Sequence, residues 1–171
     1  ILIKKYMVTR VLFVCTGNVF RSFSAEKCLQ KYLEDKGITN IVVDSAGISK
    51  HIGKRREPVH PETRRMLKTY GIDPRYHRRK KITKKIVQES DVIIAMSFNH
   101  QEYIKKHFGI DVPLFYELIG KGHKPVKDIP DVIHNWQSHP VKTVHHIDKI
   151  VTFIHDNTPR VYATIKKKLK S

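Results

Sequence analysis

A cysteine and an arginine six residues apart have the side chains needed to bind and attack a phosphate group. Cys15 ends the short apolar run 11–14, and Arg21 follows after a segment that contains Gly17 and Asn18. Glycine and asparagine tolerate positive φ, so this backbone can curl until its N–H groups point inward and form a nest for an anion. The arginine adds a planar fork that holds two phosphate oxygens. The spacing therefore predicts a phosphate-binding loop with a thiol inside it.

Ser22, directly after the arginine, is a residue type that caps helices. A helix that starts there would point the positive end of its dipole at the loop. N–H groups, a helix N-terminus and a guanidinium all favour the ionised form of Cys15. A single cysteine after an apolar strand is more often a small buried hydrophobe. Because Gly17, Asn18 and Ser22 all stand where the loop needs them, we favour the functional interpretation.

The elements that must position this loop alternate between strands and helices. Residues 8–14 form an apolar run typical of a strand buried on both faces, and 22–36 have the period of an amphipathic helix. The further elements expected are strands 40–44, 91–96 and 112–115 and helices 61–70, 83–90 and 99–108, then an amphipathic helix after 136–139 and a basic tail helix 161–170 that starts at Thr158-Pro159. This order predicts the α/β class, with a four-stranded parallel sheet and helices on both faces.

The pattern Cys-x-Gly-Asn-x-x-Arg-Ser after a first strand resembles the active-site loop of the low-molecular-weight protein tyrosine phosphatases. Segments 44–47, 71–73, 91–96 and 128–131 and His77 follow in the order which that family shows. The resemblance implies strand order 2-1-3-4 and a metal-free, cofactor-free hydrolysis of phosphotyrosine through a phosphocysteine. The residues it assigns to phosphate binding are Thr16, Gly17, Asn18, Val19, Phe20 and Ser22, around catalytic Cys15 and Arg21. Ser22 should also donate a hydrogen bond to the departing thiolate.

A phosphate ester also needs an acid to protonate its leaving oxygen. The family places an Asp-Pro pair on a late loop for this purpose, and Asp131 aligns with that aspartate, although Val132 replaces the proline. Asp128 is the second candidate. The alternative is that both carboxylates only stabilise turns. Since the first step needs an ionised thiol together with a protonated aspartate, the rate should rise and then fall with pH, with an acidic to neutral optimum.

The resemblance also assigns supporting residues. In the family a serine, the loop asparagine and a histidine form a hydrogen-bond network that holds the strained loop, and the matching residues here are Ser45, Asn18 and His77. The loop after 44–47 usually supplies an aromatic wall beside the active site. Lys50 and His51 stand there instead, so we expect cationic contacts to replace part of that wall.

Particular residues argue against two activities found in related proteins. Arsenate reductases of similar fold need further cysteines, and only Cys28 remains, on the buried stripe of the first helix, where we interpret it as a packed core thiol. Protein-arginine phosphatases carry threonine where this chain has Val19, and an apolar residue there favours an aryl ring. Phe20 replaces the neighbouring loop cysteine of many relatives, so the catalytic thiol cannot be protected as a disulfide across the loop.

Composition limits the remaining possibilities. With 171 residues, 40% of them hydrophobic, the chain can form one folded domain with a core. We expect that domain at 8–157, with 1–7 as a disordered or non-native extension and 158–171 as the tail. Two cysteines indicate a reducing compartment, and with no long apolar run we expect a cytoplasmic protein without a membrane partner.

The formal charge of +17 is concentrated in two blocks. Residues 50–85 have a net charge of +11, and 160–171 add five basic residues without an acidic one. Such a field attracts anionic partners, or is only a solvated surface. The alternative function is a module that binds phosphoproteins or polyanions with little catalysis. Nucleic acid is not favoured, because no basic and aromatic interleaving is present. The sequence does not identify the substrate protein or the oligomeric state.

Overall fold

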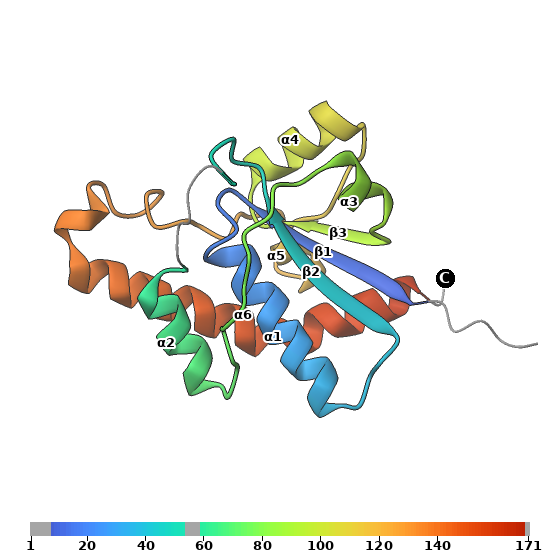
Figure 1. The fold of residues 1–171 in the computed structure, drawn as a ribbon, viewed down its shortest axis with the longest axis horizontal. Helices are drawn as coiled ribbons and strands as arrows, with labels where there is room; N and C mark the ends of the chain where they lie inside the picture. The colour runs from blue at the N-terminus through green and yellow to red at the C-terminus, as the bar shows by residue number, and fades with distance from the viewer. Residues whose placement is uncertain (1–7, 54–58, 170–171) are drawn as a thin grey trace, which may run out of the picture.

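The computed structural model describes residues 8–53 and 59–169. Its centre is a parallel sheet of three strands in the order β2-β1-β3, formed by Ile41–Gly47, Thr9–Cys15 and Val92–Ala95. Figure 1 shows the three strands side by side. The register pairs Val11 with Val43 and with Val92, and Cys15 with Gly47, so the thiol lies at the carboxyl end of the central strand.

Two hydrophobic cores lie on opposite faces of the sheet, because successive side chains of a strand point to opposite sides. Val11 and Phe13 of β1 pack in the larger core, with residues of α1 (Arg21–Asp35), α2 (Pro61–Thr69), α5 (Phe115–Leu118) and α6 (Pro140–Lys168). Leu12 and Val14 pack in the smaller core, with residues of α3 (Lys84–Gln88) and α4 (Phe98–Phe108). β1 is thus buried on both faces, as its apolar sequence predicted, and the sheet has helices on both sides.

The expected fourth strand, 112–115, was wrong. In the described part of the chain a single parallel bridge pairs Ala95 with Leu114, and α5 begins at the next residue. The bridge lies beside β3, where a fourth strand would continue the sheet. Pro113 has no N–H to donate, and the Leu114 N–H donates to the Glu117 carboxylate at 2.6 Å, which turns the chain into α5.

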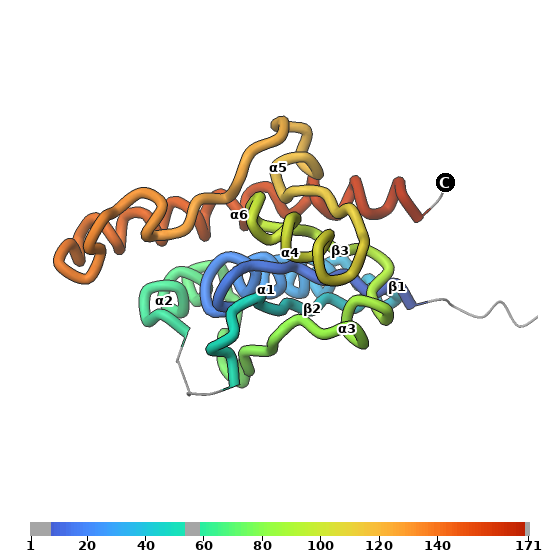
Figure 2. Tube along the Cα trace, turned by 90° about the horizontal axis from the view of Figure 1, so that it is seen from above, coloured from blue at the N-terminus to red at the C-terminus, as the bar shows by residue number. Residues whose placement is uncertain are grey.

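The separate tail helix starting at Thr158-Pro159 was also wrong. α6 continues through Pro159 to Lys168 as one 29-residue helix, which runs along the length of the molecule in Figures 1 and 2. Proline interrupts the helical hydrogen-bond ladder. Just before it, the Asn157 amide donates to the carbonyl of Phe153 at 2.8 Å and the Thr158 hydroxyl to that of Ile154 at 2.9 Å, so side chains bond the carbonyls near the interruption. Residues 1–7, expected to be an extension, lie outside the described residues.

The last turns of α6 belong to the core. Val161 and Ile165 are 1% exposed, and the Thr164 hydroxyl donates to the carbonyl of Leu118 at 2.7 Å. The end of the helix therefore packs in the larger core and is hydrogen-bonded to α5.

Candidate active site

The loop between β1 and α1 is shaped by one residue with positive φ. Asn18 has φ of 55° and is fully buried. We expected Gly17 to share that conformation, but its φ is not positive. A Cβ on Gly17 would make only ordinary van der Waals contacts. Its carbonyl accepts a hydrogen bond from Nε of Arg79 at 2.7 Å. The curl of the loop therefore depends on Asn18.

The loop places two hydrogen-bond partners on the thiol. The hydroxyl of Ser22 lies 2.9 Å from Sγ of Cys15, and the N–H of Asn18 donates to the same sulfur at 3.3 Å. The expectation that Ser22 caps α1 was wrong: the helix starts at Arg21, its cap position is Phe20, and no side chain caps it. The serine hydroxyl instead faces the sulfur, where a donated hydrogen bond stabilises a thiolate.

The expected contacts of Asn18 with Ser45 and His77 are present. The Asn18 side-chain amide donates to Oγ of Ser45 at 2.8 Å and to Oγ of Ser22 at 3.1 Å. Nε2 of His77 lies 2.7 Å from the carbonyl oxygen of Asn18, and its ring lies against Phe23 with centroids 4.0 Å apart. Burial lowers the pKa of His77, and the hydrogen bond to Asn18 opposes that shift. Side chains from β2, α1 and the segment before α3 thus hold the left-handed residue.

A close approach of β2 supports the other side of the loop. A Cβ on Gly47 would lie 2.6 Å from the carbonyl oxygen of Thr16 and 3.1 Å from the nitrogen of Asn18. The N–H groups of Ile48 and Ser49 donate to the carbonyls of Cys15 and Thr16, each at 3.0 Å. Only glycine allows this contact. Sequence reasoning treated Gly47 as part of a motif and did not recognise its packing role.

Arg21 is 2% exposed and lies between the loop and the segment before α6. Its Nη1 donates to the carbonyl of Val126 at 3.0 Å, and its Nη2 forms an ion pair with Asp128 and lies 3.4 Å from Oγ1 of Thr16. The guanidinium is therefore buried but held by protein groups on several sides.

The two candidate acids occupy different environments. Asp128 is bound to the guanidinium, with its side chain 26% exposed. Asp131 is exposed, and its Oδ2 accepts a hydrogen bond from the N–H of Asp128 at 2.7 Å. Nε2 of His146, in α6, lies 3.2 Å from the carbonyl oxygen of Lys127 and so contacts the segment that contains both aspartates. The structure thus brings Asp128 into contact with Arg21 and Asp131 into contact with Asp128.

A buried histidine, His100, was missed by sequence reasoning. It lies in α4, 84 residues from the loop, and its Nε2 is 2.9 Å from Oγ1 of Thr16. Its Nδ1 has no hydrogen-bond partner among the described residues. Burial, together with the nearby charge of Arg21, lowers the pKa of His100 to about 3, so the ring is neutral behind the loop. No local pattern in the sequence connects the two segments.

The other predicted positions lie around the loop. Val19 is half-buried, whereas Phe20 is 5% exposed and packs in the larger core with its ring 6.5 Å from that of His146. Lys50 and His51 are exposed in the segment after β2 that hydrogen-bonds to the loop. The His51 N–H donates to the hydroxyl of Ser49 at 3.2 Å.

Cys28 lies on the buried face of α1, as the helical stripe predicted. Burial raises the pKa of its thiol to about 12, and the charge of Asp156 adds to that shift. The two cysteines therefore differ in chemistry, because Cys28 stays protonated at neutral pH and lacks the hydrogen-bond partners that face Cys15.

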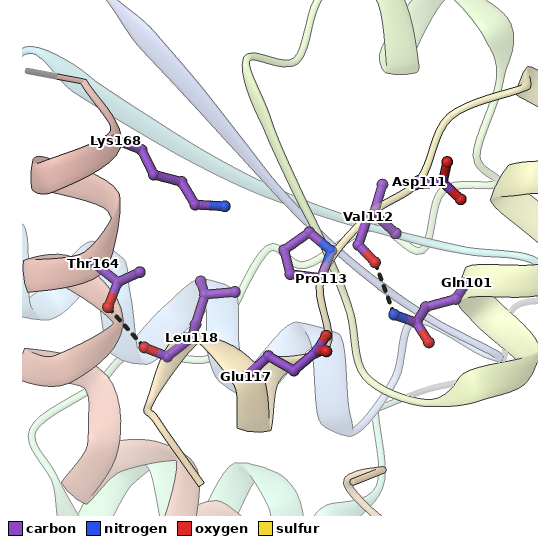
Figure 3. Close-up of a pocket in the computed structure, with 8 residues that line it drawn as sticks. All are labelled: Gln101, Asp111, Val112, Pro113, Glu117, Leu118, Thr164 and Lys168. Atoms are coloured by element: carbon purple, nitrogen blue, oxygen red, sulfur yellow. Dashed lines mark hydrogen bonds between the residues drawn. The ribbon is translucent and has the colours of Figure 1, made fainter. Parts of the chain in front are cut away.

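A pocket of about 420 Å³ lies away from these residues, between α4, α5 and the end of α6. Figure 3 shows its lining residues, with Gln101 bonded to the carbonyl of Val112 and Thr164 to that of Leu118. Both polar side chains tie helices to the segment that replaces the fourth strand. We therefore interpret this pocket as a consequence of packing at the sheet edge.

Comparison with known proteins decides the family. The sequence model of the family described as "Low molecular weight phosphotyrosine protein phosphatase" matches residues 10–171. The chain belongs to this family. A low molecular weight protein-tyrosine-phosphatase of Acinetobacter johnsonii is 31% identical over 121 residues, which cover 71% of this chain and 78% of that protein. The phosphatase PtpB of Staphylococcus aureus is 28% identical over 151 residues, covering 85% and 94%.

Solved structures agree on the fold of this phosphatase. A mutant of the arginine phosphatase YwlE superposes with a TM-score of 0.76 at 22% identity, covering 93% of this chain and 97% of that one. Family membership makes the chain a phosphatase enzyme, so the alternative of a binding module without catalysis is not retained. Among the helices of the described residues, none has both the length and the apolar character to cross a bilayer.

Proposed function

We propose that this phosphatase hydrolyses phosphotyrosine in proteins, with Cys15 as the nucleophile. The observation that carries the proposal is the position of Sγ of Cys15, 2.9 Å from the Ser22 hydroxyl and 3.3 Å from the Asn18 N–H, at the start of a loop that ends at Arg21. Both neighbours can donate to sulfur, so the loop favours a thiolate at the place where a phosphate would bind.

In the first step the thiolate attacks phosphorus in line. The bond from phosphorus to the phenolic oxygen breaks, and the proton of Asp131 passes to that oxygen, which leaves a phosphocysteine and a free tyrosine. In the second step the Asp131 carboxylate takes a proton from water as the water oxygen attacks phosphorus. The bond from phosphorus to sulfur breaks, phosphate leaves, and the Ser22 hydroxyl donates to the returning thiolate.

The surroundings of the two carboxylates favour Asp131 as the acid. Asp128 forms an ion pair with the Arg21 guanidinium, so its Oδ2 is already held by the arginine of the loop. Asp131 uses Oδ2 to accept from the Asp128 N–H, which leaves Oδ1 for the proton. A bound phosphate would share the donors of Arg21 with Asp128, so Asp128 would position the guanidinium and the acid together.

Hydrolysis of an aryl phosphate in the presence of a chelator tests these roles. Cys15→Ser should abolish turnover. Asp131→Asn should lower kcat by about 10²–10⁴-fold, the usual contribution of a general acid, and remove the fall in rate at alkaline pH. Asp111→Asn, which removes an exposed carboxylate paired with Lys105, is the matched control and should leave the rate unchanged. Turnover by Cys15→Ser would refute the assignment of the nucleophile.

The substrate class depends on Val19. We propose that its apolar side chain favours the aryl ring of phosphotyrosine, and that exposed Lys50 and His51 contact acidic residues next to it. At least two of the similar structures are arginine phosphatases, so phosphoarginine is the competing substrate. Phosphotyrosine and phosphoarginine peptides of the same sequence should be compared with wild type and Val19→Thr. A wild-type preference for phosphoarginine would overturn this part of the proposal.

A further inference from the structure

A buried carboxylate stands at the end of the hydrogen-bond chain that leads to the thiol. Glu26 of α1 is 5% exposed, and its Oε2 is bound to the hydroxyl of Ser45. Its Oε1 lies 3.0 Å from the ammonium of Lys27 and 3.2 Å from the side-chain nitrogen of Gln30. From Glu26 the contacts continue through Ser45, Asn18 and Ser22 to the sulfur.

The hydrogen positions in this chain follow from the chemistry of its members. An ionised carboxylate only accepts hydrogen bonds, so the Ser45 hydroxyl must donate to Glu26. The Ser45 oxygen is then left to accept from the Asn18 amide nitrogen at 2.8 Å. Oδ1 of Asn18 accepts from the backbone N–H of Lys80 at 3.0 Å, which agrees with the same amide orientation.

The same orientation determines where the Ser22 hydrogen points. The Asn18 amide nitrogen lies 3.1 Å from Oγ of Ser22 and donates its second hydrogen to that oxygen. The Ser22 hydrogen is then available to the sulfur of Cys15 at 2.9 Å. If the amide were flipped, its oxygen would accept from Ser22 and Ser45, and the sulfur would lose a donor.

We propose that Glu26 is a positioning residue that selects the amide orientation in which Ser22 donates to Cys15. The Ser45 hydroxyl donates its only hydrogen to Glu26. If the Asn18 amide flipped, its oxygen would face the Ser45 oxygen without a hydrogen between them, and two acceptors in contact are unfavourable. The inference rests on the proposed role of Cys15 and adds to it Glu26, which acts through Ser45 together with the Lys80 N–H that donates to Oδ1 of Asn18.

The isosteric change Glu26→Gln tests the direction of the hydrogen bonds between position 26 and Cys15. Lys27 and Gln30 both donate toward Oε1, so the new amide should place its oxygen there and its NH₂ toward Ser45. Ser45 would then accept from position 26 and donate to Asn18, whose amide would flip at the loss of its hydrogen bond from the Lys80 N–H, and the Ser22 hydrogen would leave the sulfur. A lost hydrogen bond to a charged group corresponds to a shift of about one unit in the titration of the Cys15 thiol, to higher pH.

The sign of that shift separates the proposal from a plain effect of charge. Removing a negative charge near the loop would by itself favour the thiolate and move the titration to lower pH. The substitution leaves the other charged and titratable groups around the loop in place. They are Arg21 and Lys27 of α1, His77, Arg79 and Lys80 before α3, His100 of α4, Asp128 and Asp131 of the acid segment, and His146 of α6.

The titration is measured by the ultraviolet absorbance of the thiolate and by the acid limb of kcat/KM. We expect both to move to higher pH by about one unit in Glu26→Gln, with kcat/KM about tenfold lower on the acid side of the optimum. Glu34→Gln, on an exposed position of the same helix, is the control and should move neither. An unchanged or lower titration in Glu26→Gln would overturn the proposal.

A double substitution shows whether Glu26 acts through Ser45. If it does, adding Glu26→Gln to Ser45→Ala should leave only the charge effect, so the double variant should titrate at the same pH as Ser45→Ala or lower, whereas a further shift to higher pH would contradict the proposed path. Thermal unfolding of each variant shows that the fold is retained at the assay temperature. The absorbance titration needs no turnover, so it distinguishes a failure of this inference from a failure of Cys15 as the nucleophile, which Cys15→Ser tests.

Discussion

Gly47→Ala should disable the phosphate loop more than it destabilises the fold. An added Cβ would lie 2.5 Å from Cδ1 of Ile52, 2.6 Å from the carbonyl oxygen of Thr16 and 3.1 Å from the nitrogen of Asn18. The isoleucine methyl can move, but the two backbone atoms belong to the loop. Overpacking of this kind costs about 1–3 kcal/mol of the free energy of unfolding. At roughly 2–4 °C per kcal/mol in a chain of this size, Tm should fall by about 2–12 °C.

The loss of activity should be larger, because the clash is relieved by moving the atoms that surround the sulfur. A displacement of about 1 Å in a catalytic site can lower the rate by roughly 10²-fold. Gly37→Ala is the matched control: its φ of 65° makes alanine unfavourable there, but a Cβ would meet nothing within 4 Å. Tm by circular dichroism and kcat/KM for an aryl phosphate should be measured for both. Wild-type kcat/KM in Gly47→Ala would refute the argument.

Three further predictions concern Cys28, His100 and Phe20. Because burial raises the pKa of the Cys28 thiol to about 12, iodoacetamide at neutral pH should modify Cys15 in the native protein and spare Cys28, as peptide mass spectrometry would show. The pKa of His100 is lowered from 6.5 to about 3, so the folded chain resists a proton that the unfolded chain accepts. Stability should therefore fall as pH drops below about 6.5, by at most about 1.4 kcal/mol per unit from this ring, and His100→Gln should flatten the fall of Tm between pH 7 and 4. With Phe20 in place of a loop cysteine, peroxide should inactivate the enzyme by over-oxidation, and full recovery with thiol after one equivalent of peroxide would contradict this.

The conformation of the loop between β1 and α1 was predictable because its signals are local. An apolar strand, a residue suited to positive φ and an arginine stand within eleven residues, and the structure places Cys15, Asn18 and Arg21 together. Of the two roles expected for Ser22, the helix cap was wrong, although a serine at a helix start is usually a cap. The position of its hydroxyl, 2.9 Å from the sulfur of Cys15, agrees with the other expected role, a hydrogen bond to the thiolate.

The supporting residues were less predictable because they lie far apart in the sequence. His100 reaches Thr16 from 84 positions away, and Glu26 reaches Ser45 from 19. Both contacts arise from the order of strands in the sheet, and a single histidine or glutamate on a helix carries no signal for them. The predicted order of strands 2, 1 and 3 was correct. The prediction of a fourth strand was wrong, because Pro113 and the hydrogen bond from Leu114 to Glu117 end the pairing after one bridge.

The continuity of α6 constrains how this protein can vary. Each residue of an α-helix turns the chain by about 100°, so an insertion or deletion of one residue between 147 and 161 would rotate everything after it. Val161 and Ile165 would leave the core, and Thr164 would no longer reach Leu118, although every side chain was unchanged. We therefore expect this span to accept substitutions on its outer face while its length stays constant among functional homologues.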